Sequence, residues 1–215
     1  MGRNLLLPLV TGLALVAAGC GGADTDTSAS GSSTVCEEVA VPAPEERTRE
    51  APGEPLEAGK TYTLTFETNC GTFVVMLDRE TAPKTAASLV ALAESGFYDA
   101  TVVHRIVPDF VIQGGDPTQE GNGGPGYATV DAPPEGTTYV KGVVAMAKTS
   151  VDPPGTSGSQ WFVVTAEDAG LPADYAVVGR VSDGLDVVEK IGQLGDEAEQ
   201  PTEPVVVEAV TVGRS

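Results

Sequence analysis

The stretch of sequence that decides the fold is FYDATVVHRIVPDFVIQGGDP, at residues 97–117. Two short apolar runs, Val102–Ile106 and Phe110–Gln113, flank a Pro-Asp step, which predicts two strands joined by a turn. In an alternating strand, His104 and Arg105 face opposite sides. An arginine beside an amide and aromatic side chains supplies a fixed fork of donors, suited to a carbonyl or an amide nitrogen. Spacing alone also fits a surface arginine flanked by core valines, so it does not identify a site.

Further strands are predicted on both sides of this stretch. Upstream, Tyr62, Leu64 and Phe66 alternate with threonines, and the chain returns after a turn at Phe73–Leu77. Downstream, short apolar runs predict four more strands, at Val143–Ala147, Trp161–Thr165, Ala176–Val178 and Val205–Val212.

Only two helices are predicted. Pro83 opens the first, because its missing N–H costs nothing at that position, and Gly96 ends it. The second is expected at about Leu185 to Ile191. About eight short strands with two helices favour a mainly β protein, built as a closed barrel rather than as a doubly wound sheet.

Composition limits the function. The chain has 215 residues, of which 41% are hydrophobic, enough for one domain with additional segments. The 12 lysines and arginines against 31 acidic residues give a net charge of −19, which would repel a phosphate backbone and excludes nucleic-acid partners. His104 is the single histidine, which excludes a multi-histidine metal site.

The N-terminus has the pattern of an export signal. Arg3 precedes an apolar run, Leu5–Ala18, that is shorter than the about 20 residues needed to span a membrane. Its end, Ala17-Ala18-Gly19-Cys20, resembles a bacterial lipobox, in which cleavage precedes the cysteine and its sulfur is lipidated. We therefore expect a signal peptide at residues 1–19, lipidation at Cys20, and a protein anchored to the extracytoplasmic face of the cell membrane.

A flexible tether is expected between this anchor and the folded domain. Residues 20–58 are rich in Gly, Ser, Thr, Pro and Glu, which leaves little to bury. Cys36 and Cys70 are the two cysteines that remain, and an exported chain meets oxidising conditions, so we favour a disulfide between them. A zinc site and two free thiols are the alternatives. The folded domain is predicted at residues 59–215.

The stretch around Arg105 is similar to the cyclophilin family of peptidyl-prolyl isomerases. The order His-Arg, short apolar run, Phe, Gln-Gly-Gly-Asp is long and specific. Residues 141–147 (KGVVAMA) and 158–165 (GSQWFVVT) also resemble family segments, and the likeness extends over about Lys60 to Gly213. The resemblance implies a closed eight-stranded antiparallel barrel capped by two helices, and an enzyme that rotates X–Pro bonds.

The resemblance also implies site residues. Arg105 corresponds to the catalytic arginine, Gln113 to the glutamine that orients it, and Phe110 to an aromatic wall. A further set would line the proline pocket or the groove for the preceding residues: Val111, Ala147, Lys148, Gln160, Phe162, Leu171 and Tyr175. Four positions depart from the family: Val111 replaces Met, Lys148 replaces Asn, Gly170 replaces a pocket Trp, and Tyr175 replaces a pocket His.

The expected reaction needs no covalent step, metal or cofactor. A donor near the prolyl nitrogen localises its lone pair and weakens the partial double bond as it twists. We expect a monomer that acts on proline-containing segments of exported or surface proteins and assists their folding. The alternatives are a membrane-anchored module that binds proline peptides without turnover, and a barrel that carries a small ligand, which a filled interior disfavours.

Two other motifs have plain interpretations. Residues 121–126 (GNGGPG) superficially suggest a phosphate loop, but no strand–loop–helix unit with a lysine follows, so a turn-rich loop is expected. The acidic residues Asp196 to Glu199 are predicted to form a solvated loop before the last strand.

Overall fold

A computed structural model describes residues 35–215. The predicted signal peptide, Cys20 and the first part of the tether lie outside the described residues. Within 35–215, no helix has both the length and the apolar character to cross a membrane.

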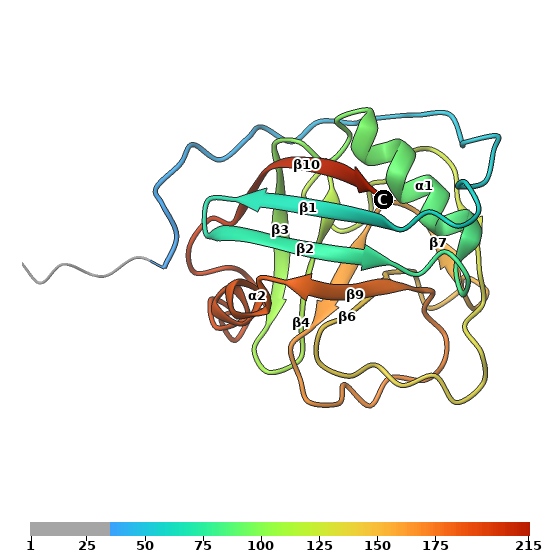
Figure 1. Cartoon of the computed structure of the whole chain (residues 1–215). Helices are drawn as coiled ribbons and strands as arrows, with labels where there is room; N and C mark the ends of the chain where they lie inside the picture. Colours follow the sequence, from blue (N-terminus) through green and yellow to red (C-terminus); the bar gives the residue numbers. More distant parts are fainter. Residues whose placement is uncertain (1–34) are drawn as a thin grey trace, which may run out of the picture. The chain divides into compact units, whose positions relative to one another are not determined.

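Eight strands close into an antiparallel barrel (Figure 1). Around the barrel they run β1-β10-β3-β4-β8-β6-β9-β2. Their bounds are β1 Tyr62–Thr68, β2 Gly71–Leu77, β3 Thr101–Val107, β4 Val111–Asp116, β6 Val143–Met146, β8 Trp161–Val164, β9 Val177–Asp183 and β10 Val206–Arg214. The predicted closed eight-stranded barrel is confirmed. A small additional pair, β5 (Thr129–Val130) with β7 (Thr156–Ser157), was not predicted.

Two helices complete the domain, as predicted. Helix α1 (Pro83–Glu94) has Pro83 in its first turn, and Gly96 follows its end with φ of 65°, the left-handed conformation that glycine tolerates best. Helix α2 spans Leu185–Gly192. The helices lie at opposite ends of β1 and β2 (Figure 1).

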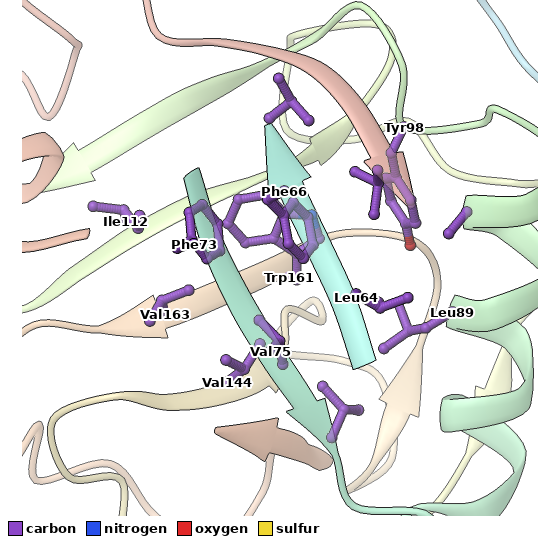
Figure 2. Close-up of a cluster of buried hydrophobic side chains, with 14 of the residues drawn as sticks. Leu64, Phe66, Phe73, Val75, Leu89, Tyr98, Ile112, Val144, Trp161 and Val163 are labelled. Atoms are coloured by element: carbon purple, nitrogen blue, oxygen red, sulfur yellow. The ribbon is translucent and has the colours of Figure 1, made fainter. Parts of the chain in front are cut away.

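The barrel interior is filled with side chains. Phe66 stacks on Phe73 with ring centroids 4.7 Å apart, and Trp161 meets Phe66 edge-on at 5.1 Å. Figure 2 shows these rings among aliphatic side chains from several strands. The space left between them is about 10 Å³, no more than a single water needs. The interior therefore has no room for a ligand, which counts against the ligand-carrying barrel.

Alternation along β4 and β8 gives these strands a second apolar face. Ile112 and Trp161 belong to the interior cluster, whereas Val111 and Phe162 belong to a separate cluster outside it. The strands pair so that Gln113 lies opposite Phe162. Because side chains alternate along a strand, Gln113 and Phe162 share the outer face. This outer face is where the predicted site residues gather.

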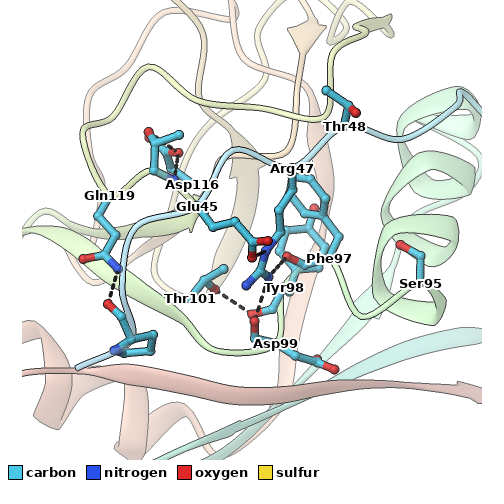
Figure 3. Close-up of polar contacts among 12 residues, drawn as sticks. Glu45, Arg47, Thr48, Ser95, Phe97, Tyr98, Asp99, Thr101, Asp116 and Gln119 are labelled. Atoms are coloured by element: carbon cyan, nitrogen blue, oxygen red, sulfur yellow. Dashed lines mark hydrogen bonds and ion pairs between the residues drawn. The ribbon is translucent and has the colours of Figure 1, made fainter. Parts of the chain in front are cut away.

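The end of the predicted tether differs from the prediction. Residues 36–58, here called the N-terminal strap, lack helix and strand as expected, but they are hydrogen-bonded to the domain rather than free. Arg47 donates from Nη1 to the carbonyl oxygens of Phe97 and Asp99, both at 2.7 Å (Figure 3). Gln119 donates to the carbonyl of Pro42 (Figure 3). The composition of the strap suggested flexibility. It could not reveal these hydrogen bonds, because the partners are 50 to 77 residues away in the sequence.

A disulfide joins the strap to the first hairpin. The Sγ atoms of Cys36 and Cys70 are bonded, and Cys70 lies in the turn between β1 and β2. The neighbouring Asn69 donates from Nδ2 to the carbonyls of Glu37 and Pro204. The bond and these hydrogen bonds hold the start of the strap at one end of the barrel.

Candidate active site

A pocket of about 220 Å³ opens on the outer face of β4 and β8. It is smaller than the about 300–1,000 Å³ of sites for drug-sized ligands, and suits a single side chain. Nine of the ten predicted catalytic and substrate-binding residues line it: Arg105, Phe110, Val111, Gln113, Ala147, Lys148, Phe162, Leu171 and Tyr175. The tenth, Gln160, lines an adjoining groove of about 440 Å³, together with Gln113, Ala147 and Lys148.

A β-bulge in β3 sets the direction of Arg105. Val103 pairs with Gly114 and Arg105 with Gln113, which leaves His104 unpaired between them. Val103 packs in the barrel interior and Arg105 lines the outer pocket, although the two residues are two positions apart, so strict alternation does not hold along this part of β3. His104 lies beside Gly121 of the loop after β4, and neither of its ring nitrogens has a hydrogen-bond partner. Burial lowers the pKa of His104 below its ordinary value, which favours the neutral imidazole.

A chain of hydrogen bonds holds the arginine on the pocket wall. Arg105 donates from Nη1 to Oε1 of Gln113 at 3.2 Å. Gln113 donates in turn to Oε1 of Gln160 at 3.1 Å, and Gln160 donates to the carbonyl of Gly123 at 2.9 Å. In this series of hydrogen bonds each side-chain amide accepts at its oxygen and donates from its nitrogen, and the guanidinium of Arg105 is the first donor. This arrangement agrees with the orienting role expected for Gln113.

The loop that ends this chain is built around Asp116. The carboxylate is buried and accepts hydrogen bonds from the backbone of Thr118, Gly121 and Gly123 and from the Thr118 hydroxyl. Burial by itself raises the pKa of Asp116, but the donors of Gly123, Thr118 and Gly121 outweigh it, so the pKa lies below its ordinary value. A side chain at Gly123 would collide with the carboxylate. The glycine-rich run is thus a structural turn, as expected.

Lys148 borders both the pocket and the groove, but its charged end is held by protein groups. Its side chain is 3% exposed, and Nζ lies 2.7 Å from the carboxylate of Asp174. Nζ also donates to the carbonyls of Thr149 and Asp152. The charge is therefore compensated, and the lysine links the loop after β6 to the loop after β8.

Tyr175 is fixed by a residue that sequence reasoning missed. The hydroxyl of Tyr139 donates to the carbonyl of Tyr175 at 2.7 Å and accepts from its N–H at 3.0 Å. The rings of Tyr139 and Tyr175 both pack on Phe162. This cluster supports the wall that Phe162 and Tyr175 present to the pocket. Tyr139 stands in a segment without alternation, so no pattern identified it.

The predicted solvated loop contains a second missed residue. Asp196, Glu197, Ala198 and Glu199 are all exposed, as expected. Glu199, however, accepts a hydrogen bond from Nε of Arg105 at 2.7 Å. The solvated loop is therefore as expected, and the contact with Arg105 is an addition that sequence spacing does not reveal, because 94 residues separate the two partners.

A larger cavity, of about 620 Å³, lies elsewhere, beside β2 and β9. Its lining includes three basic residues, Lys60, Arg79 and Arg180, and several aliphatic ones, but no aromatic side chain. Among residues 35–215, no group of three or more His, Cys, Asp or Glu side chains converges as metal ligands would. Of these two cavities, it is the smaller pocket that combines aromatic side chains with an arginine whose donors are oriented by a neighbouring amide.

Fold and site together define a prolyl-isomerase-like barrel, and comparison with known proteins identifies its family. Residues 63–212 match the family described as cyclophilin type peptidyl-prolyl cis-trans isomerase/CLD. The chain is 40% identical over 155 residues to peptidyl-prolyl cis-trans isomerase-like 1 of Neurospora crassa, covering 69% of this chain and 93% of that protein. It is 39% identical over 171 residues to peptidyl-prolyl cis-trans isomerase A of Mycobacterium tuberculosis, covering 71% and 92%. The chain therefore belongs to the cyclophilin-type peptidyl-prolyl isomerases.

Solved structures agree. A cyclophilin-type isomerase of Cryptosporidium parvum superposes with a TM-score of 0.65 and 27% identity, over 71% of this chain and 98% of that one. The structure of that isomerase in the presence of the dipeptide Ala-Pro superposes with a TM-score of 0.64 and 28% identity, over 70% of this chain and 98% of that one.

Proposed function

We propose that this chain rotates X–Pro peptide bonds in the pocket formed by Arg105, Phe110, Phe162 and Leu171. The observation that carries the proposal is the hydrogen bond from Arg105 to Gln113 at the edge of an apolar pocket of about 220 Å³. The proline ring occupies the apolar floor, and the guanidinium faces the prolyl nitrogen. No other group in the pocket is needed as a base or nucleophile.

The chemistry follows from amide resonance. Rotation has a barrier of about 18–20 kcal/mol because the C–N bond has partial double-bond character. As the bond twists, the lone pair returns to the prolyl nitrogen, where a donor stabilises it. Arg105 accelerates the reaction only if it binds the twisted state more strongly than either planar isomer. The packed walls of Phe110 and Phe162 reduce contact with water, which strengthens that interaction.

The acceleration required is modest. Uncatalysed isomerisation takes tens to hundreds of seconds, a rate of about 10⁻² per second. Reaching a median enzyme rate of about 10 per second requires about 4 kcal/mol. One preorganised donor typically contributes about 2.7–4 kcal/mol, so Arg105 supplies most of what is needed.

We further propose that the isomerase acts outside the cytoplasm, tethered by lipid at Cys20, on exported or surface proteins whose folding it assists. The apolar run Leu5–Ala18 and the lipobox-like Ala17-Ala18-Gly19-Cys20 support this location. A disulfide between Cys36 and Cys70 suits an oxidising compartment.

A protease-coupled assay on an X–Pro peptide, with the full chain purified in detergent, tests the reaction. We expect wild-type turnover well above the uncatalysed rate. Peptide binding without acceleration would instead favour the non-catalytic proline-binding module.

The location has its own test. Metabolic labelling with a palmitate analogue should mark the wild type and not Cys20→Ala, and the Cys36 and Cys70 thiols should resist alkylation until a reductant is added. A labelled Cys20→Ala variant, or thiols alkylated in native protein without reductant, would contradict the proposed anchor or export.

A further inference from the structure

We propose that Glu199 is a positioning residue for the catalytic arginine. Its carboxylate accepts the Nε hydrogen of Arg105 at 2.7 Å, while Gln113 accepts a hydrogen from Nη1 at 3.2 Å. The two acceptors lie 8 and 94 residues after Arg105 in the sequence, and they hold different edges of one planar group. This inference rests on the proposed catalytic role of Arg105.

The donor inventory explains what the arrangement does. A guanidinium has five N–H donors in a fixed plane. Glu199 takes the one on Nε and Gln113 takes one on Nη1, so the three remaining N–H groups are on the Nη side of the plane. Two fixed edges also restrict rotation of a long, flexible side chain that is 34% exposed. The donors that face substrate are therefore oriented before the substrate binds.

The loop is built to present this carboxylate to Arg105. The carbonyl of Glu199 accepts a hydrogen bond at 3.0 Å from the N–H of Ile106, the residue after Arg105. Asp196 caps the turn by accepting at Oδ1 from the N–H groups of Ala198 and Gln200. At Gly195 a Cβ would lie 2.5 Å from the carbonyl oxygen of Ile106, so only glycine allows the loop to approach β3 this closely. Backbone and side chain of Glu199 thus bind adjacent residues of β3.

Backbone conformation gives an independent indication. Glu199 has φ of 63°, in the left-handed region that is uncommon for residues other than glycine. Such conformations persist where the surroundings enforce them, and they cluster at functional sites. Glycine would relieve the strain here, so a purely structural loop would gain from glycine. The glutamate side chain is then best explained by its contact with Arg105.

Three variants test the proposal, assayed on full-length protein by NMR exchange at varied concentrations of a proline peptide. Glu199→Gly removes the carboxylate and suits the backbone, so we expect unchanged or higher thermal stability. We expect its kcat to fall about fivefold with little change in KM. A fivefold change in rate is what a well-oriented, exposed ion pair can contribute. Glu199→Gln keeps an acceptor oxygen and should restore most of kcat. Glu197→Gln removes the same charge from the same loop and should match the wild type.

Different results would contradict the positioning role of Glu199 and the proposed function. Wild-type kcat in Glu199→Gly, or a Glu199→Gln variant as slow as Glu199→Gly, would overturn the positioning role. A further loss when Glu199→Gly is added to Arg105→Ala would also overturn it, because the effect would then not pass through Arg105. An inactive wild type would refute the proposed function itself, which distinguishes that failure from this one.

Discussion

The inner and outer faces of β4 and β8 are both well packed, yet they differ in what the packing leaves open. Inside, Ile112 and Trp161 are 0% and 2% exposed, and the remaining space is about 10 Å³. Outside, Val111 and Phe162 are 2% and 5% exposed, but they border a pocket of about 220 Å³ beside Arg105. Neighbouring residues on one strand therefore fill the barrel interior on one face and border the candidate site on the other. On the outer face, the loop residues Leu171 and Tyr175 complete the pocket wall.

The largest expected effect breaks the inner face. Trp161→Ala should lower the free energy of unfolding by about 3–5 kcal/mol, because it removes the ring that packs on Phe66 and Phe73 and leaves a cavity. Urea unfolding followed by circular dichroism measures this. Leu171→Ala, a partly exposed pocket residue, is the control and should cost about 1 kcal/mol or less. Similar losses in both variants would contradict the contrast between the faces.

The next effect is a loss of activity on the outer face, with no change in the packing of the barrel interior. Arg105→Ala should lower kcat/KM about 100- to 1,000-fold, which corresponds to a loss of about 2.7–4 kcal/mol of transition-state stabilisation. The free energy of unfolding should not change. Arg180→Ala serves as the matched control, since Arg180 lies on β9 in the other cavity. An Arg105→Ala variant with half the wild-type kcat/KM would remove Arg105 from the mechanism.

A smaller effect is expected from a substitution in the N-terminal strap, which belongs to neither face of β4 and β8. Arg47→Ala should destabilise the protein by about 1.5–3 kcal/mol, because its charged donor satisfies the carbonyls of Phe97 and Asp99. Isomerase activity should stay at the wild-type level, as no strap residue lines the pocket. Thermal unfolding, with Arg49→Ala as the exposed control, checks this. Equal unfolding midpoints for Arg47→Ala and the wild type would show that this contact of the strap adds no stability.

The smallest expected effect is a pH dependence of stability caused by His104, which lies next to Arg105 on β3. Because burial lowers the pKa of His104 in the folded state, the unfolded chain takes up the proton first as pH falls below about 6.5. Stability should therefore decrease as pH falls below about 6.5, and recover as pH rises back through that value. His104→Phe should show a shallower decrease in unfolding midpoint over the same range. Parallel curves for the two proteins would contradict the lowered pKa.

Much of the fold could be predicted because it depends on local pattern. The period-2 alternation in β1, the short apolar runs of β3 and β8 and the turns between strands indicated short strands, and Pro83 and Gly96 marked the first helix. The bulge at His104 was not predictable, since nothing in the residues of β3 distinguishes it from a regular strand. The strap was misjudged as fully flexible because its composition lacks apolar periodicity, whereas its stability comes from hydrogen bonds to distant carbonyls.

By itself, the sequence determined the class of fold, the family resemblance, and the residues that line the pocket, because alternation and a long ordered motif are carried by neighbouring positions. The tertiary structure alone decided how charges meet. Glu199 reaches Arg105 across 94 residues, and Asp174 neutralises Lys148 across two loops. Such contacts depend on how loops approach the barrel, down to the close packing of Gly195 on Ile106. Spacing along the chain holds no information about that approach, since loop geometry is set by packing against strands that are distant in sequence.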